Sequence, residues 1–230
     1  EGSGSASASA SAGTTHIPDG PWVITFDNFL SKEERDVLIH YGHTIGKGFQ
    51  QSKVRVGTAG SANRTSSTNW INHEALMDPI IIEIQRKLEK VTGYVFPENN
   101  FEPLQVLRYG EGGKYDHHHD YFPPLGDRSH GHRVLTIFLY LNDVESGGGE
   151  THFRDLGGAA AAAAATEGMA ITPRAGRMLI WPSVLNERPN ERDDRTFHGS
   201  LPVGEGGIKY GANAWIHIRD YRTPKRKCKF

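Results

Sequence analysis

The chain has 230 residues and a mass of 25.4 kDa, enough for one domain with a buried core. Its 26 basic and 27 acidic residues leave a formal charge of −1. That balance argues against a nucleic-acid-binding protein and against a protein that lies on an anionic membrane, because both need a basic excess. The single cysteine, Cys228, excludes an internal disulfide. No apolar run reaches the roughly 18 residues of a membrane span, and no signal-peptide pattern opens the chain.

The two ends of the chain differ in composition from the rest. Residues 1–16 are rich in Gly, Ser and Ala, which bury too little surface to offset the cost of ordering, so we expect a disordered linker or tag. Residues 222–230 hold five basic residues and are expected to be a solvated tail. The remainder, 17–221, is predicted to form a single domain.

The first part of that domain carries one strand signal and two helix signals. Residues 22–26 alternate as a strand does. Ser31 and Glu34 have capping-box spacing and predict a helix to about Tyr41. A second helix is predicted from Glu74 to about Val91, because apolar residues recur every three or four positions before Gly93. Between the helices, residues 42–69 are polar without periodicity, a length that suggests function, and we predict a substrate lid there.

From residue 101 onward the pattern changes to short strands. They are predicted at 104–109, 134–141, 169–172, 178–181, 196–201 and 212–218, separated by Gly and Pro clusters. Helices followed by many strands favour an α+β, mainly β domain, in which residues 17–100 support a jelly-roll core over 101–221. The alanine run 159–165 interrupts the strands, and we interpret it as a surface insertion in a loop.

The chemistry is predicted to lie near a cluster of histidines. Five of the 12 histidines fall within 16 residues, and His118 and Asp120 share one face if this segment is a strand. With a distant histidine such as His198 they would complete the two-histidine, one-carboxylate set of non-haem iron. On spacing alone, three adjacent histidines are equally compatible with a solvated tract or a casual zinc site.

A lysine downstream favours the iron interpretation. Lys209 follows His198 by 11 residues across the glycine-rich segment 204–207, so it is predicted on the next strand with its side chain directed inward. An oxoacid bound to iron would need such a fixed cation for its far carboxylate. Trp215 has the same strand parity as Lys209 and is predicted to wall the same pocket.

Several segments resemble the prolyl 4-hydroxylases, within the Fe(II)/2-oxoglutarate-dependent dioxygenases. The residues that carry the resemblance lie in the right order over about 20–221 and comprise segments 26–34, 105–120, 133–144, 147–151, 196–203 and 209–217. The resemblance implies a double-stranded β-helix fold and a reaction that couples decarboxylation of 2-oxoglutarate, to succinate and CO2, with hydroxylation of peptidyl proline at C4.

The resemblance also implies roles for ten residues. His118, Asp120 and His198 would bind iron. Lys209 would bind the distal carboxylate of 2-oxoglutarate, with Tyr109 and Thr151 supplying hydroxyls and Trp215 lining the cavity. Tyr115, Arg133 and His217 would lie at the mouth of the site, where related enzymes meet the peptide. The family further implies O2 as co-substrate and ascorbate as the reductant that restores the iron.

The chain departs from the family pattern without losing a required group. His117 stands where proline is frequent, the Lys209 spacing is one residue longer, and the alanine run is additional. The other histidines receive structural interpretations: His130 and His132 are predicted to lie in a surface loop, and His152 to point away from the pocket.

Two rival interpretations stay open at this point: a 2-oxoglutarate dioxygenase acting on another residue or a free amino acid, and a non-catalytic jelly-roll binding module. The expected partner is a proline-rich peptide or protein, with no nucleic acid and no membrane contact. The family resemblance favours the lumen of the endoplasmic reticulum or Golgi. Neither the identity of the substrate nor the oligomeric state follows from the sequence.

Overall fold

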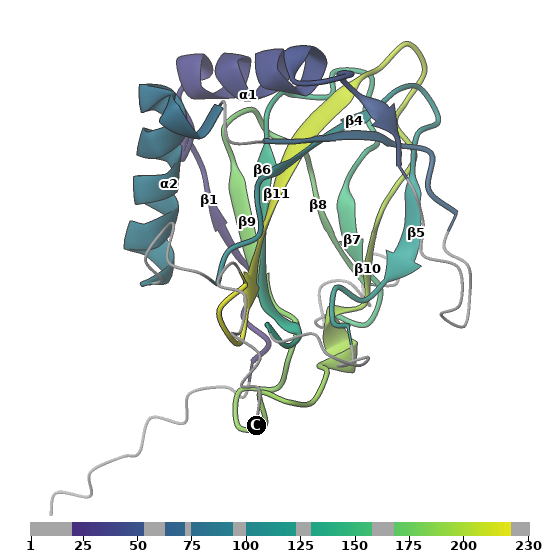
Figure 1. Ribbon diagram of the computed structural model, residues 1–230. Helices are drawn as coiled ribbons and strands as arrows, with labels where there is room; N and C mark the ends of the chain where they lie inside the picture. Colours follow the sequence, from purple (N-terminus) through teal and green to yellow (C-terminus); the bar gives the residue numbers. More distant parts are fainter. Residues whose placement is uncertain are drawn as a thin grey trace, which may run out of the picture.

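The computed structural model describes residues 20–52, 63–71, 75–93, 100–122, 130–157 and 168–221. The predicted linker, the alanine run, the basic tail and the centre of the predicted lid lie outside these residues. Within them, two helices pack beside two antiparallel sheets (Figure 1). No helix in these ranges is long and apolar enough to cross a membrane.

The first helix, α1 (Lys32–Thr44), begins where the sequence predicts and continues three residues beyond Tyr41. Ser31 Oγ accepts from the Glu34 amide at 3.2 Å, and Glu34 Oε2 accepts from the Ser31 amide at 2.7 Å, so the capping box is confirmed. Glu34 is buried and forms an ion pair with Lys87 of the second helix at 2.7 Å. The cap therefore also joins the two helices.

The second helix, α2 (Pro79–Thr92), starts later than predicted. A turn of 3-10 helix, η1 (Ala75–Met77), precedes it, and Asp78 caps it by accepting from the Ile80 amide at 2.7 Å. The sequence signal for this start is the pair Asp78-Pro79, a capping residue followed by a proline in the first turn. At the other end Gly93 adopts the left-handed conformation with φ 73°, as predicted.

The larger sheet has the strand order β1-β9-β6-β11-β4-β3-β2 and the smaller sheet the order β5-β10-β7-β8. Every pairing in both sheets is antiparallel, and the two sheets face each other as in a double-stranded β-helix. The strands are β1 (Ile24–Phe26), β2 (Gln50–Gln51), β3 (Ser67–Trp70), β4 (Gln105–Tyr109), β5 (Tyr115–His118), β6 (Arg133–Tyr140), β7 (Thr151–Phe153), β8 (Met169–Ile171), β9 (Met178–Pro182), β10 (His198–Ser200) and β11 (Lys209–His217).

Three predicted boundaries differ from the structure. Strand β11 begins at Lys209, three residues earlier than expected, and so carries the lysine itself. A 3-10 turn, η2 (Asp194–Thr196), occupies the start of the predicted strand 196–201, leaving only His198–Ser200 in β10. The described parts of the predicted lid contain β2 and β3, which pair with each other and continue the large sheet through β4. The described parts therefore belong to the edge of the large sheet. A substrate lid in the segment between them stays a prediction.

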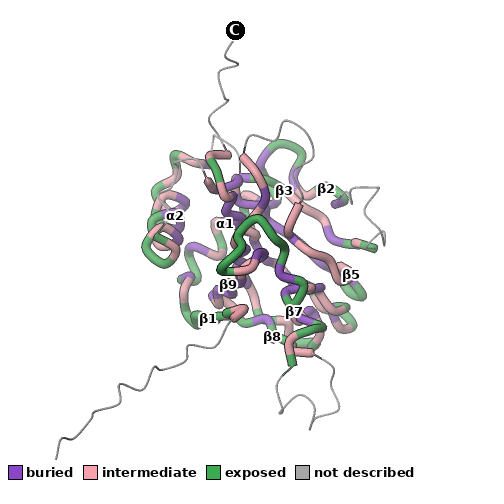
Figure 2. Tube along the Cα trace, turned by 90° about the horizontal axis from the view of Figure 1, so that it is seen from below, coloured by how far each residue is buried: buried purple, intermediate pink, exposed green. Residues whose placement is uncertain are grey.

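Alternation along the strands of the large sheet separates two cores. Figure 2 shows buried segments in the interior of the molecule and exposed segments mostly at its periphery. One face packs on the helices and is lined by aliphatic residues such as Leu139 and Ile216. The other faces the small sheet and carries aromatic residues, among them Phe138, Tyr140 and Trp181. The space between the sheets is thus bounded by aromatic rings, and the candidate site lies at its edge.

Candidate metal centre and dicarboxylate pocket

Strands β5 and β10 bring the three predicted iron ligands together. His198 pairs directly with His118, and the register then shifts, so that Ser200 pairs with Tyr115. This bulge puts two residues of β5, Asp116 and His117, opposite one of β10, Gly199, which places Tyr115 on the same side as His118. The Tyr115 and His118 rings stack with centroids 3.7 Å apart. Simple alternation predicts opposite sides for these two residues, and the bulge is the reason for the difference.

His118, Asp120 and His198 each offer one ligand atom, and these three atoms lie within 4.8 Å of one another. His118 Nδ1 lies 2.9 Å from the Asp116 carbonyl and His198 Nδ1 lies 2.8 Å from the Thr196 carbonyl. A carbonyl can only accept, so each Nδ1 carries the proton and each Nε2 is free to ligate. The Nε2 atoms face the two oxygens of Asp120, at 3.7 and 3.6 Å.

Burial and neighbouring charges keep these ligands in the protonation states a metal requires. Burial, reinforced by the His198 ring, lowers the pKa of His118 to about 3, so its imidazole is neutral near pH 7. The pKa of Asp120 is held far below its usual value although burial opposes this, because His198, His118 and Arg133 stabilise the carboxylate. Two imidazole nitrogens and one carboxylate fit Fe(II) and leave further coordination positions for small oxygen ligands.

The Asp120 carboxylate is oriented by two residues of the large sheet. Its Oδ2 accepts from Thr136 Oγ1 of β6 at 2.8 Å and from Trp215 Nε1 of β11 at 3.1 Å. Arg133 Nη1 lies 3.8 Å from the other oxygen. The small sheet therefore supplies the histidines, while the large sheet fixes the carboxylate between them.

Lys209 lies at the centre of a buried cluster of aromatic residues, which is called the Lys209 pocket below for the ligand it is expected to hold. Its side chain is 1% exposed, and Nζ donates to Ser200 Oγ at 2.8 Å. The rings of Tyr109, Phe138 and Tyr140 surround Nζ, with centroids at 5.2, 5.0 and 5.6 Å. Burial lowers the pKa of Lys209 to about 7, and Glu150 only partly opposes that effect. A buried ammonium held by one hydroxyl and three rings is suited to receive an anion.

The strand β10 sets the distance between this pocket and the metal centre. His198 and Ser200 point to the same face, and two residues along a strand span about 7 Å. One end of a short dicarboxylate can therefore reach the metal ligands while its other end reaches Lys209. This length favours a molecule such as 2-oxoglutarate over a larger anion.

The predicted hydroxyl donors take up different places around Lys209. Thr151 Oγ1 accepts from Tyr140 O–H at 2.6 Å, so Tyr140 stands between Thr151 and the lysine pocket. Tyr109 presents its ring to Lys209 and is buried. Tyr140 and Ser200 were missed by sequence reasoning, although both have the strand parity of a pocket residue. The roles of Tyr109 and Thr151 in binding 2-oxoglutarate stay predictions.

Trp215 shares the inner face of β11 with Lys209, as parity predicts, but lies at the other end of that strand. Six residues separate them, which is about 20 Å along a strand. The indole bonds to Asp120 and stacks under Arg133, whose guanidinium carbon lies 3.6 Å from the ring centroid. Trp215 therefore orients a metal ligand, and its place in the lining of the 2-oxoglutarate cavity stays a prediction.

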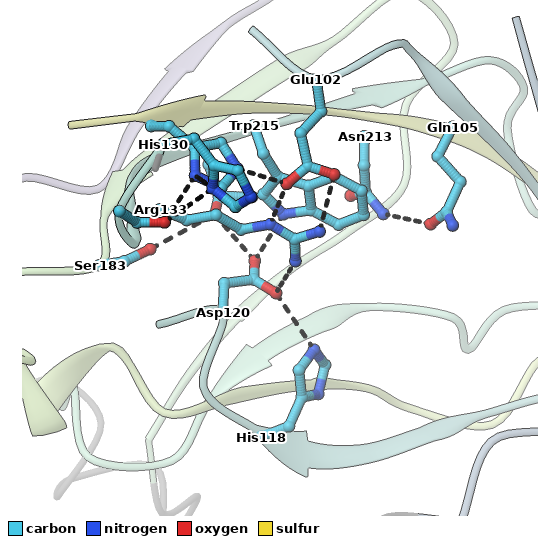
Figure 3. A network of polar contacts seen from close by, with 12 residues as sticks. Glu102, Gln105, His118, Asp120, His130, Arg133, Ser183, Asn213 and Trp215 are labelled. Atoms are coloured by element: carbon cyan, nitrogen blue, oxygen red, sulfur yellow. Dashed lines mark hydrogen bonds and ion pairs between the residues drawn. The ribbon is translucent and has the colours of Figure 1, made fainter. Parts of the chain in front are cut away.

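Arg133 and His217 converge on a carboxylate that the sequence did not single out, Glu102. Figure 3 shows Glu102 beside Arg133. Glu102 Oε1 accepts from Arg133 Nε at 2.6 Å and from His217 Nε2 at 2.7 Å, while Oε2 accepts from Arg133 Nη2 at 3.0 Å. Burial alone would raise the pKa of Glu102, but these two partners lower it, so the carboxylate is ionised. His217 is 3% exposed, which corrects its expected place at an open mouth: it lies behind Arg133.

The remaining histidines divide into buried and outward-facing residues. His130 lies in a turn and is half-buried against His217, in keeping with the predicted loop, whereas His132 is buried and donates to the Pro189 carbonyl at 2.5 Å, so a surface position is wrong for His132. His152 lies on the outer face of the small sheet, 2.7 Å from His117, and points away from the pocket as predicted. Their sequence context gave no sign of the tertiary partners that bury them.

The comparisons with known proteins agree with this geometry. Residues 104–217, which contain all the predicted site residues, match the model of the 2OG-Fe(II) oxygenase superfamily. The chain is 35% identical to probable prolyl 4-hydroxylase 7 of Arabidopsis thaliana, over 93% of this chain and 68% of that protein. It is 30% identical to prolyl 4-hydroxylase subunit alpha-2 of Gallus gallus, over 87% of this chain but only 35% of that protein.

Solved structures give the same result. The fold matches a viral collagen prolyl hydroxylase from Paramecium bursaria Chlorella virus 1 in complex with 2-oxoglutarate, with a TM-score of 0.61, 29% identity and coverage of 86% and 97% of the two chains. A prolyl hydroxylase of Trichoplax adhaerens shares the fold, at a TM-score of 0.55 and 16% identity.

Fold and site together define an Fe(II)/2-oxoglutarate-dependent oxygenase, with a double-stranded β-helix and a His-Asp-His metal centre. Its cofactors are Fe(II) and 2-oxoglutarate. Within that class the chain belongs to the prolyl 4-hydroxylase family, because its identity to curated members extends over most of its length.

Proposed function

We propose that this chain hydroxylates C4 of prolyl residues in proline-rich peptides and converts 2-oxoglutarate to succinate and CO2. His118, Asp120 and His198 would hold Fe(II), and Lys209 would bind the distal carboxylate of 2-oxoglutarate. Fe(II) with 2-oxoglutarate and O2 supplies the oxidising chemistry that replaces a C–H bond by C–OH. The observation that carries the proposal is β10, whose His198 and Ser200 link the metal ligands to the Lys209 pocket.

The protein's own part in this reaction is to place the groups and to exclude water. Lys209 and Ser200 hold one end of the co-substrate in a dry aromatic pocket, where a charge interaction is stronger than in water. Thr136 and Trp215 hold the Asp120 carboxylate in a fixed orientation. The rings around Lys209 would keep solvent from the distal carboxylate of 2-oxoglutarate.

The peptide is proposed to lie over Tyr115 and Trp70, beside the metal centre. Arg64 covers the Tyr115 ring at 4.6 Å, and Trp70, 40% exposed, lies 6.1 Å from the ring centroid of Trp215. Proline-rich chains are preorganised as polyproline II helices and bind to aromatic surfaces. Trp70 lies beside Trp215, which donates to Asp120, and Tyr115 stacks on His118, so a proline ring resting on Trp70 would lie near the metal ligands.

Release of succinate tests the proposed reaction most simply. Wild-type protein with Fe(II), 2-oxoglutarate and ascorbate should release succinate much faster when a poly-proline peptide is present. His118→Ala should abolish that increase, because it removes one of the three ligands. Turnover that ignores both the peptide and the His118→Ala change would overturn the proposal. Stimulation by free proline in place of the peptide would point to the rival substrate class.

Trp70 tests the peptide surface separately. Trp70→Ala should raise the KM for the peptide about tenfold, the order of one stacking anchor at an interface, and leave the KM for 2-oxoglutarate unchanged. Trp22→Ala is the matched control, since Trp22 is 47% exposed and lies beside β1, at the opposite edge of the sheet. Equal peptide KM values for both variants would remove Trp70 from the proposed binding surface.

A further inference from the structure

We propose that His130 is a positioning residue for the metal centre, acting through His217, Glu102 and Arg133 on Asp120. None of these links is a covalent or catalytic step, and His130 itself touches neither Asp120 nor the dicarboxylate pocket. Its effect on turnover rests on the proposed function. Its effect on the His217 ring does not.

The four links are short and continuous (Figure 3). His130 Nδ1 lies 3.0 Å from His217 Nδ1, and His217 Nε2 lies 2.7 Å from Glu102 Oε1. Glu102 holds the guanidinium of Arg133 through two bonds, at 2.6 and 3.0 Å. Arg133 Nη1 ends the chain 3.8 Å from Asp120 Oδ1. A rotation of the His217 ring would release Glu102 and so loosen the arginine that faces the metal ligand.

The loop that carries His130 is fixed on the end of β11. The Arg219 amide donates to the His130 carbonyl at 3.2 Å, and the Ile218 amide donates to the His132 carbonyl at 3.1 Å. Gly131 between them has φ 71°, and a Cβ there would lie 2.5 Å from the Ile218 side chain. The two histidine rings meet edge to face at 84°, with centroids 4.5 Å apart. His130 is therefore held against His217 by backbone as well as by its ring.

A count of protons identifies what His130 supplies. Glu102 is an acceptor, so His217 Nε2 carries a proton. Three further atoms face one another, His130 Nδ1, His217 Nδ1 and the Gly131 carbonyl, at separations of 2.9, 3.0 and 3.1 Å. One proton must bridge them. We place it on His130 Nδ1, because the distances from this atom to the two possible acceptors, 2.9 and 3.0 Å, are shorter than the 3.1 Å from His217 Nδ1 to the carbonyl.

In this arrangement His130 donates to both acceptors and holds His217 as the neutral ring protonated at Nε2. The metal-free protein, labelled with 15N at histidine, tests it without any turnover. His217 should show one pyridine-type nitrogen, Nδ1, and one pyrrole-type nitrogen, Nε2. Two pyrrole-type nitrogens on His217 would mean that the proton lies on His217, and a protonated Nδ1 with a bare Nε2 would mean that Glu102 receives no hydrogen bond. Either spectrum overturns the proposal.

Two amide variants separate the donor from the bulk of the ring. In His130→Asn the amide nitrogen is attached to Cγ, as Nδ1 is, so the donor stays in place. In His130→Gln it lies one bond further out, as Nε2 does. The His217 spectrum should be retained in His130→Asn and changed in His130→Gln and His130→Ala. If His130→Asn shifts His217 as far as His130→Ala does, or if none of the three variants moves it, His130 does not position His217.

The kinetic readout should follow the same order. His130→Gln and His130→Ala should raise the KM for Fe(II) about fivefold, the loss expected for one hydrogen bond, with the 2-oxoglutarate KM within twofold of wild type. His130→Asn should behave as wild type, and all three melting temperatures should agree closely. Parallel changes in both KM values, or losses that follow the melting temperature, would assign His130 a merely structural role. Absence of turnover in the wild type would instead reject the proposed function and leave the spectral result standing.

Discussion

At the residue scale, Asp120 depends on neighbours that are not themselves metal ligands. Thr136 Oγ1 donates to its Oδ2 at 2.8 Å in a buried setting. Residues that orient a metal ligand typically contribute about 10- to 100-fold to metal affinity. We therefore predict that Thr136→Val weakens Fe(II) binding by about tenfold, because the carboxylate loses a donor. Thr136→Ser, which keeps the hydroxyl, is the control.

Metal affinity measured by competition with a chelator checks this prediction. The affinity for Fe(II) should fall in the order wild type, Thr136→Ser, Thr136→Val, and Thr136→Val should bind the metal clearly more weakly than the other two. Equal affinities for the two variants would show that the hydroxyl does not support Asp120.

Lys209 should make the binding of 2-oxoglutarate dependent on pH. Burial lowers the pKa of the free lysine to about 7, and a bound carboxylate favours the charged ammonium, so the complex has the higher pKa. The stabilising charge pair is fully present below about pH 7. Above it, binding must take up a proton, and affinity falls by up to about tenfold per pH unit until the pKa of the complex is reached.

Calorimetry between pH 6 and 9, in buffers of different ionisation enthalpy, measures both the affinity and the proton uptake. Lys209→Arg is the matched control, because a guanidinium stays charged over this range. It should bind 2-oxoglutarate with little dependence on pH above 7. The same decline in Lys209→Arg as in wild type would assign the effect to another group.

At the scale of elements, β11 needs a glycine where it passes the aromatic pocket. A Cβ at Gly211 would lie 2.3 Å from the Phe138 ring, whose centroid lies 5.0 Å from Lys209 Nζ. Gly211→Ala should therefore push the ring into the pocket, destabilise the fold by about 1–3 kcal/mol and raise the KM for 2-oxoglutarate. Thermal denaturation and kinetics measure the two effects.

The double variant Gly211→Ala with Phe138→Leu gives the matched test of this packing. The smaller side chain removes the clash, so the double variant should recover 2-oxoglutarate binding relative to Gly211→Ala alone. If the effects of the two substitutions on 2-oxoglutarate binding are simply additive, Phe138 is not the residue that Gly211 accommodates.

Much of the secondary structure could be predicted from local sequence patterns. The capping box at Ser31 and the stop at Gly93 are local signals, and each is confirmed. His118 and Asp120 do lie together, although β5 ends at His118 and Asp120 follows the strand. The bulge in β5 and the positions of Glu102 and His130 were not predictable, because each depends on a partner strand far away in the sequence. Short motifs identify ligands well, whereas residues that orient those ligands have no local signature.

At the scale of the whole molecule, two sheets divide the tasks of the site. The small sheet carries the histidines and Ser200, and the large sheet carries Lys209 and the residues that orient Asp120. The helices cover the opposite face of the large sheet, with Glu34 and Lys87 paired between them (Figure 1). The site therefore lies between rigid elements, so that its geometry is set by sheet packing.

The most direct test of the proposed function is to determine which carbon of the prolyl residue is hydroxylated. A proline-rich peptide should be treated with the iron-loaded protein, 2-oxoglutarate and O2, and its hydroxyproline located by NMR while succinate is counted in the same sample. We predict 4-hydroxyproline, equal in amount to the succinate released above the peptide-free rate, and none with His118→Ala. Hydroxylation at C3, or succinate without any hydroxyproline, would contradict the central claim.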